Sequence, residues 1–235
     1  MKFSWIGLLA LFAALVIGDQ IRIGRPDHKY RLTVEVETPD GIKSGSGVMS
    51  VTPNRGYGGS GSGETSGPRL KGDAVLVDLG AGRNLVALLA HESDGRDSEG
   101  VVFLAMRAYV AAGNRIQFRE VKRMATAVPV TGDLVPILMT FKNIADPGSA
   151  RKVAPDRLED TFGKGFRLRG ISLTAARNGF WPLDFGGVLG EPVTRGIEMK
   201  LPWWGRGDRP AAIALNAAGV TIGEASTPEA AFTRK

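Results

Sequence analysis

Apolar and polar residues alternate along one early segment of the chain. From residue 30 to residue 38 the even positions are mostly apolar, whereas the odd positions are charged or hydroxylated. A period of two predicts a half-buried antiparallel strand. Residues 39–41, Pro-Asp-Gly, are typical of a turn, and residues 46–52 can return as a second strand. We therefore expect a hairpin in this part of the chain.

Two mostly apolar runs, 73–79 and 83–90, predict a second hairpin around the sequence Gly-Ala-Gly at 80–82. Because both faces of these strands are apolar, a second layer must cover them. The stretch 53–72 that precedes them is rich in Gly and Ser and has little to bury. It is expected to be a flexible loop.

Three segments predict helices. Residues 99–112 form an apolar run that is longer than a typical strand and stops at Gly113, so we expect a helix that covers the sheet. Residues 155–162 begin with Pro and predict a short helix. Residues 193–201 predict another, which Gly196 weakens.

Two later segments, 135–141 and 166–174, predict further strands. In the second, the apolar positions change phase across Gly170, as a β-bulge would produce. Strands thus outnumber helices, and Gly and Pro separate them regularly. This favours a β-rich α+β fold with a mainly antiparallel, sandwich-like sheet and a few covering helices, after an N-terminal hydrophobic helix.

The pattern divides the chain into three parts. Residues 1–21 are expected to be a membrane anchor or signal peptide, and residues 22–209 a single β-rich α+β domain that contains the flexible loop 53–72. Residues 210–235 are rich in Ala and show little periodicity. They are expected to form a loosely held C-terminal tail.

The N-terminal segment has two interpretations. Residues 3–18 carry no charge and would form a helix of about 24 Å, somewhat short for a hydrocarbon core of about 30 Å. Arg22 and Arg25 follow it, whereas only Lys2 precedes it, which favours an uncleaved anchor in the cell membrane. The alternative is a signal peptide cut before Asp19, with the domain in the periplasm.

Composition excludes several chemistries. The 235 residues contain no cysteine, so disulfides, thiolate zinc sites, iron–sulfur clusters and cysteine nucleophiles are excluded. The two histidines, His28 and His91, are far apart in the sequence. The acidic stretch 91–99 could offer oxygen ligands to a cation, but its spacing and Arg96 favour a solvated loop. We therefore expect no metal and no cofactor.

The chain is moderately basic, with 30 Lys and Arg against 24 Asp and Glu. This charge permits contact with anionic lipid or nucleic acid without specifying either. Several basic residues could line one face: Arg119, Lys122, Arg123, Arg151, Lys152, Arg157, Arg167 and Arg169. Acidic residues lie among them, as on an ordinary mixed surface. With no recognisable nucleic-acid-binding module, no nucleic-acid partner is expected.

Two short motifs match known chemistry but lack its context. Gly56, Gly58 and Gly61 fit G-x-G-x-x-G, yet no apolar helix follows to receive a pyrophosphate. Ser149 and Lys152 fit the S-x-x-K pairing of penicillin-binding enzymes, but the companion motifs are absent. The first is interpreted as a flexible loop and the second as part of a turn. No catalytic residue is assigned.

The paired tryptophans near the C-terminal end are the strongest candidate contact. Trp203 and Trp204 follow Pro202 and precede Gly205 and Arg206. Large aromatic residues in such a setting suit an interface anchor or a membrane-surface contact, so Trp203, Trp204 and Arg206 are the predicted binding residues. The alternative is that at least one Trp caps the core.

Three blocks of the sequence resemble a bacterial family of uncharacterised proteins with an N-terminal hydrophobic segment. They are YRLTVEVETPDG at 30–41, DPGSARKVAPDRLEDTFGKG at 146–165 and EPVTRGIEMKLPWW at 191–204. The resemblance covers about two thirds of the chain. The family brings no activity, cofactor or catalytic residue.

Together these features favour a membrane-attached bacterial protein that acts as a non-catalytic binding or structural module of the cell envelope. The membrane and a protein of the envelope are the partners to expect. Two alternatives remain open. One is an envelope hydrolase with dispersed active-site residues, and the other is a lipid-binding module. The sequence favours a protein without enzymatic activity but does not decide this.

Overall fold

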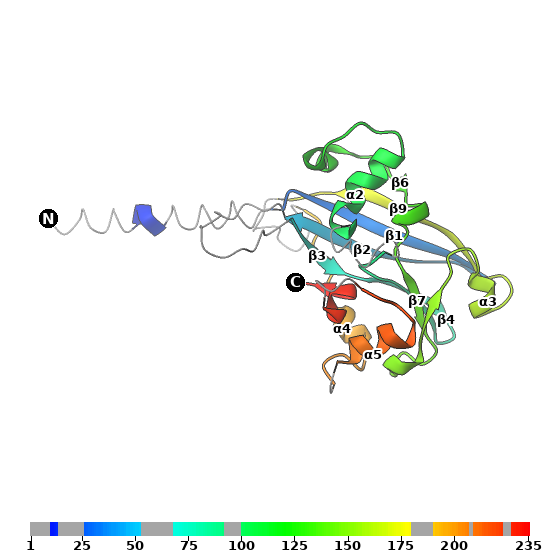
Figure 1. The fold of residues 1–235 in the computed structure, drawn as a ribbon. Helices are drawn as coiled ribbons and strands as arrows, with labels where there is room; N and C mark the ends of the chain where they lie inside the picture. Colours follow the sequence, from blue (N-terminus) through cyan, green and yellow to red (C-terminus); the bar gives the residue numbers. More distant parts are fainter. Residues whose placement is uncertain are drawn as a thin grey trace.

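Two antiparallel sheets build the domain (Figure 1). The computed structural model describes residues 10–13, 26–52, 68–91, 100–179, 190–206, 209–222 and 227–235. The larger sheet has the strand order β10-β3-β2-β1-β9-β6, and the smaller sheet has the order β4-β5-β7-β8. The strands are β1 (His28–Thr38), β2 (Gly41–Thr52), β3 (Arg69–Asp73), β4 (Val75–Gly80), β5 (Arg83–Ala87), β6 (Val128–Pro129), β7 (Leu138–Phe141), β8 (Ala150–Val153), β9 (Arg167–Ala176) and β10 (Thr233–Arg234).

Short helices complete the domain. The α-helices are α2 (Gly100–Ala111), α3 (Leu158–Phe162), α4 (Ile197–Lys200) and α5 (Pro210–Ala217), and the 3-10 helices are η1 (Phe118–Arg123), η2 (Gly132–Leu134), η3 (Pro147–Ser149) and η5 (Pro228–Ala231). The expected β-rich, antiparallel α+β architecture is confirmed. The N-terminal hydrophobic helix lies outside the described residues, apart from 10–13. In the described part of the chain, no helix is both long and apolar enough to cross a membrane.

The first predicted hairpin is confirmed over its whole length. β1 pairs with β2 from His28 opposite Val51 to Thr38 opposite Gly41, where a φ of 105° favours glycine. The apolar residues of β1 are buried, as the alternation predicts. On its other side β1 pairs with β9, and the register shifts beside Gly170, which confirms the predicted bulge.

One face of the larger sheet is shared between a helix and the smaller sheet. α2 lies over the Tyr30 end of β1, where the Tyr30 hydroxyl donates to the carbonyl of Val101 at 3.3 Å. Further along, β4 covers β2 closely, because a Cβ on Gly45 would lie 2.6 Å from the Leu76 carbonyl oxygen. Tyr30 and Val101 belong to one apolar core, which also contains Val75 and Val77 of β4.

The C-terminal segment belongs to the domain, in contrast to the predicted loose tail. Ala214 and Leu215 of α5, together with Phe232, are buried in a second core on the other face of the smaller sheet. Asp73 ties this segment down, since its carboxylate accepts hydrogen bonds from the Thr233 hydroxyl at 2.7 Å and the Ile197 amide at 3.0 Å. An Ala-rich helix packs through small side chains, so its sequence carries little periodicity.

Other boundaries shift slightly. The predicted helix 99–112 and the second hairpin are confirmed by α2, β4 and β5. Residues 69–73 form β3, although the sequence places 69–72 in the flexible loop 53–72, of which 53–67 lie outside the described residues. The helix predicted over 193–201 is reduced to α4. It begins after Gly196, whose backbone has a left-handed conformation.

Candidate functional site

The smaller sheet opens at one end, between β5 and β7. Only two residue pairs join these strands, Val86 with Met139 and Ala87 with Leu138. Beyond them, the Asn84 side chain takes the place of the opposite strand's backbone. Its amide nitrogen donates to the Phe141 carbonyl at 2.9 Å, and its oxygen accepts from the Phe141 amide at 2.9 Å. The two strands are therefore held apart by the length of a side chain.

This arrangement leaves no backbone group of Phe141 unpaired in the buried gap. Asn84 is only 4% exposed, and its own carbonyl accepts a 2.6 Å hydrogen bond from the Thr140 hydroxyl. A carboxamide carries one donor group and one acceptor, so it can replace both backbone hydrogen bonds of a ladder residue. Asn84 thus opens the sheet without the cost of unsatisfied buried groups.

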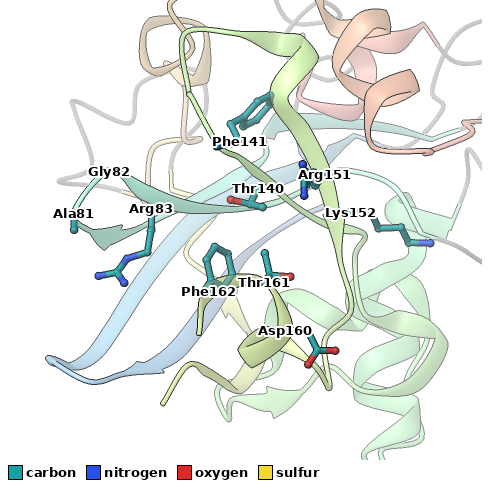
Figure 2. Close-up of a pocket in the computed structure, with 11 residues that line it drawn as sticks. Ala81, Gly82, Arg83, Thr140, Phe141, Arg151, Lys152, Asp160, Thr161 and Phe162 are labelled. Carbon is teal, nitrogen blue, oxygen red and sulfur yellow. The ribbon is translucent and has the colours of Figure 1, made fainter. Parts of the chain in front are cut away.

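A cleft of about 550 Å³ lies at the opened end (Figure 2). The turn between β4 and β5 lines one side of it, β7 and β8 line another, and α3 lies against it with Thr161 and Phe162. Figure 2 shows Phe162 near the centre of the cleft, with Thr140 and Arg151 on the strands beside it. The cleft is open to solvent on one side.

Basic side chains dominate the lining. They are Arg83, Lys142, Arg151 and Lys152, and Asp160 is the only acidic lining residue among the described residues. Alternation along the strands puts three of the cations on one face. Arg83 precedes buried Leu85 by two residues, Arg151 lies opposite Thr140, and Lys142 follows Thr140 by two. Lys152 belongs to the opposite face of β8.

Arg83 is held in place at the mouth of the cleft. Its Nε donates to the Gly80 carbonyl at 3.2 Å, and its guanidinium carbon lies 4.6 Å from the centre of the Phe166 ring. A cation over an aromatic face is stabilised electrostatically. No carboxylate in the described part of the chain forms an ion pair with Arg83. Its terminal nitrogens therefore remain available to a ligand.

The turn that carries Arg83 into the cleft is strained. Gly80, Ala81 and Gly82 all have positive φ, of 83°, 51° and 75°. Glycine adopts this conformation readily, whereas alanine does so at a cost of about 1–2 kcal/mol. The Asp78 carboxylate accepts from the Gly80 amide at 2.8 Å and fixes the start of the turn. Backbone strain of this kind is often found beside functional sites.

The basic residues that could line one face do not form a single surface, and two of them are paired with carboxylates, as on the mixed surface that the sequence favours. Arg167 and Arg169 lie on the larger sheet and pair with Glu37 and Glu35. Arg157 is a separate exposed residue beside Asp156. Arg151 and Lys152 instead join the cleft, where the structure adds Arg83 and Lys142. Sequence reasoning missed these two, although both lie at alternate positions at the ends of apolar strands.

The structure separates the three predicted binding residues. Trp203 is 3% exposed and lies in the second core, with its ring centre 5.7 Å from those of Phe141 and Phe232. The alternative that one Trp caps the core is therefore correct for Trp203. Trp204 is half-buried and Arg206 is exposed, so a contact through these two stays a prediction.

Ser149 of the S-x-x-K match is structural. The Ser149 hydroxyl donates to the carbonyls of Asn143 and Asp146 at 2.8 and 2.7 Å, and it accepts from the Asn143 amide. This hydroxyl therefore closes the turn before β8. Lys152 lies on β8, and no hydrogen bond joins it to Ser149 among the described residues. The G-x-G-x-x-G match lies outside the described residues.

Neither histidine lies in the cleft. His28 is fully buried at the start of β1, with its Nδ1 3.4 Å from the Asp27 carboxylate and its ring against Phe118. Burial lowers the pKa of His28, although the Asp27 carboxylate opposes this shift. His91 has its Nε2 2.9 Å from the Leu134 carbonyl oxygen. Within the described ranges, no three His, Asp or Glu side chains are arranged to hold a metal ion.

Comparison with known proteins gives no match: no family model, curated protein or solved structure is similar to this chain. Function is therefore inferred from the geometry and chemistry of the cleft.

Proposed function

We propose that this chain is a membrane-attached bacterial protein whose sandwich-like α+β domain is a non-catalytic binding module, and that its cleft binds an anionic group. The observation that carries the proposal is the opening of the smaller sheet by Asn84. It exposes a concave surface where Arg83, Lys142 and Arg151 gather without an ion pair to any described carboxylate. A structural surface has no need of this arrangement.

The charge of the cleft favours an anion. Arg83, Lys142 and Arg151 lie on one face, and no salt bridge involves any of them in the part of the chain that the structure describes. Guanidinium groups donate several hydrogen bonds in a fixed plane that fits phosphate or carboxylate oxygens. An anion between these side chains would relieve their mutual repulsion. Binding is therefore expected to weaken as the salt concentration rises.

The lining favours binding over catalysis. Nucleophilic catalysis needs a nucleophile beside a group that activates it. The described lining residues include no histidine or serine, the Thr140 hydroxyl is used in its bond to Asn84, and no hydrogen bond between described residues joins the Thr161 hydroxyl to an activating group. Asp160 forms no ion pair with a described residue. The hydrolase alternative thus has no support in the cleft, and the polar lining gives little support to the apolar cavity that a lipid-binding module requires.

Membrane attachment rests on residues 3–18 and on the resemblance to a bacterial family with an N-terminal hydrophobic segment. The described domain begins at residue 26, only a few residues after this apolar run. A domain so close to an anchor would stay within reach of the membrane surface. The N-terminal residue of the protein in the membrane fraction tests this part. An intact segment supports the anchor, whereas a chain that starts at Asp19 indicates export and cleavage.

Calorimetric titration with pyrophosphate tests the binding function. The full chain in a nonionic detergent is compared with the double variants Arg83→Gln/Arg151→Gln and Arg167→Gln/Arg169→Gln, which remove the same charge at different places. Loss of the cleft arginines is expected to weaken binding at least tenfold, since each charged hydrogen bond contributes about 1.5–3 kcal/mol. The sheet variant is expected to change affinity less than twofold. Equal losses in both variants would contradict the proposal.

A further inference from the structure

The cleft is too large for a simple anion. Its volume of about 550 Å³ falls in the range of about 300–1,000 Å³ that is usual for sites holding organic ligands. A phosphate group would occupy only a small part of it. The rest of the lining is therefore free to contact another part of the same ligand.

The second part of the lining differs in chemistry from the first. The cations come from β5, β8 and the end of β7, whereas α3 contributes Asp160, Thr161 and Phe162. In Figure 2, Arg83 and Asp160 lie on opposite sides of Phe162. The cleft thus has a cationic side and a side that offers a carboxylate, a hydroxyl and an aromatic ring.

Asp160 limits what the ligand can carry on the α3 side. An ionised carboxylate only accepts hydrogen bonds, so it attracts hydroxyl or amine donors and repels a second anionic group. Asp160 is exposed, and it has no salt-bridge partner among the residues described. A ligand donor can therefore reach it without displacing an internal contact.

Phe162 provides the apolar surface between these two sides. Its ring is partly exposed and lies against Phe166, with 5.7 Å between the ring centres. Phe166 also lies under the Arg83 guanidinium. The ring is thus fixed from behind, and its open side suits the C–H groups of a sugar or another polyol.

On the basis of the proposed function, we infer that the ligand is a phosphorylated polyol. Its phosphate binds between Arg83 and Arg151, its carbon skeleton lies on Phe162, and its hydroxyl groups donate to Asp160. Such a ligand combines an anion with hydroxyl donors, as the two sides of the cleft require. A sugar phosphate and the phosphoglycerol headgroup of a lipid share this chemistry.

The variant Asp160→Asn tests the inference through opposite effects on two ligands. The full chain in nonionic detergent is titrated with inorganic phosphate and with glucose 6-phosphate. Removal of the Asp160 charge is expected to strengthen phosphate binding about two- to threefold, because one repulsive charge is lost. The same variant is expected to weaken glucose 6-phosphate binding at least fivefold, because its hydroxyls lose a charged acceptor.

The control variant Asp156→Asn removes an acidic residue that is also exposed but does not line the cleft. It is expected to leave both affinities unchanged. Stronger binding of both ligands by Asp160→Asn would overturn the inference while leaving anion binding intact. If neither phosphate nor glucose 6-phosphate binds the unmodified protein, the proposed function itself fails.

Two further ligands identify the class and its source. Soluble glycerol 3-phosphate is compared with a water-soluble short-chain phosphatidylglycerol. Tighter binding of the lipid, lost in Asp160→Asn, supports the inference and assigns a lipid headgroup, whereas equal or weaker binding of the lipid supports it and assigns a free polyol phosphate. An acidic peptide of Glu residues that binds as tightly as glucose 6-phosphate would overturn it.

Discussion

The arginines of this domain lie in two contrasting environments. On the larger sheet, Arg167 of β9 lies opposite Glu37 of β1 in register, and its guanidinium is 2.6 Å from that carboxylate. In the smaller sheet, Arg151 of β8 lies opposite Thr140 of β7, which offers no charge. The same type of side chain is therefore neutralised by one strand register, whereas the other register gives it no counterion among the described residues.

This difference explains why the net charge of the chain is a poor guide to function. Salt bridges between exposed residues of neighbouring strands contribute little to stability, but they do remove local charge from the surface. Arg83, Lys142 and Arg151 in the cleft carry the same formal charge, and no described carboxylate neutralises it, so this charge can attract a ligand. What distinguishes them is the opening of the sheet at Asn84, which brings several cations around one concave surface.

The largest effect is expected from removing the Asn84 side chain, which separates β5 from β7 at the cleft. Asn84→Ala leaves the amide and carbonyl of Phe141 unpaired, and Phe141 is 1% exposed. The free energy of unfolding is expected to fall by about 2–4 kcal/mol, measured by urea denaturation, because unpaired buried polar groups are costly. Pyrophosphate affinity should fall as well, since the strands are no longer held apart.

Thr140→Val is the control for Asn84→Ala, because it removes a single hydrogen bond at the same place. It removes only the hydroxyl that donates to the Asn84 carbonyl and is expected to cost about 1 kcal/mol. If Asn84→Ala retained the stability and the pyrophosphate affinity of the unmodified protein, Asn84 would not be what forms the cleft.

Protonation of His28 would place a positive charge at a third position, in the buried interior of the domain. The pKa of His28 is lowered by burial from its ordinary value of 6.5. The unfolded chain therefore binds more protons just below pH 6.5, and the folded protein loses stability as the pH falls through this window. The slope reaches at most about 1.4 kcal/mol per pH unit.

The variant His28→Gln is expected to remove this part of the pH dependence between pH 6.5 and 5, measured by urea denaturation at each pH. The Asp27 carboxylate and the Lys122 side chain, which act on His28 in opposite directions, are unchanged in this variant. A slope equal to that of the unmodified protein would show that another group causes the loss.

The smallest effect is expected from the paired arginines. Glu35→Gln breaks the 3.5 Å contact with Arg169 on the exposed face of the larger sheet. The free energy of unfolding should change by less than about 1 kcal/mol, since both side chains are almost half exposed. A loss comparable to that of Asn84→Ala would mean that this pair is structural, and the contrast drawn above would not hold.

Much of the fold could be predicted from local patterns. The alternation along β1, the turn at Gly41 and the phase change at Gly170 each identify their structure, because period and turn chemistry are local properties. The short strand β3 and the helix α5 could not be found in this way. Both depend on distant segments, because Asp73 of β3 accepts bonds from Thr233 and Ile197, and α5 packs into the second core.

The candidate site was harder to predict for the same reason. Arg151 and Lys152 were recognised as basic residues, but nothing in the sequence joins them to Arg83, which lies almost seventy positions earlier. Asn84 looks like an ordinary polar residue at the start of a strand, and its bonds to Phe141 depend on the tertiary fold. Prediction therefore favoured conspicuous residues such as Trp203, which serves the core.

The most direct test of the central claim follows the arginine side chains individually. NMR spectra of the Nε–Hε groups of the full chain are recorded during a titration with pyrophosphate, with assignment by single Arg→Lys variants. The signals of Arg83 and Arg151 are expected to shift together with one dissociation constant, while those of Arg167 and Arg169 stay in place. Equal shifts at all four arginines, or shifts confined to Arg167 and Arg169, would contradict the claim that the cleft is the anion site.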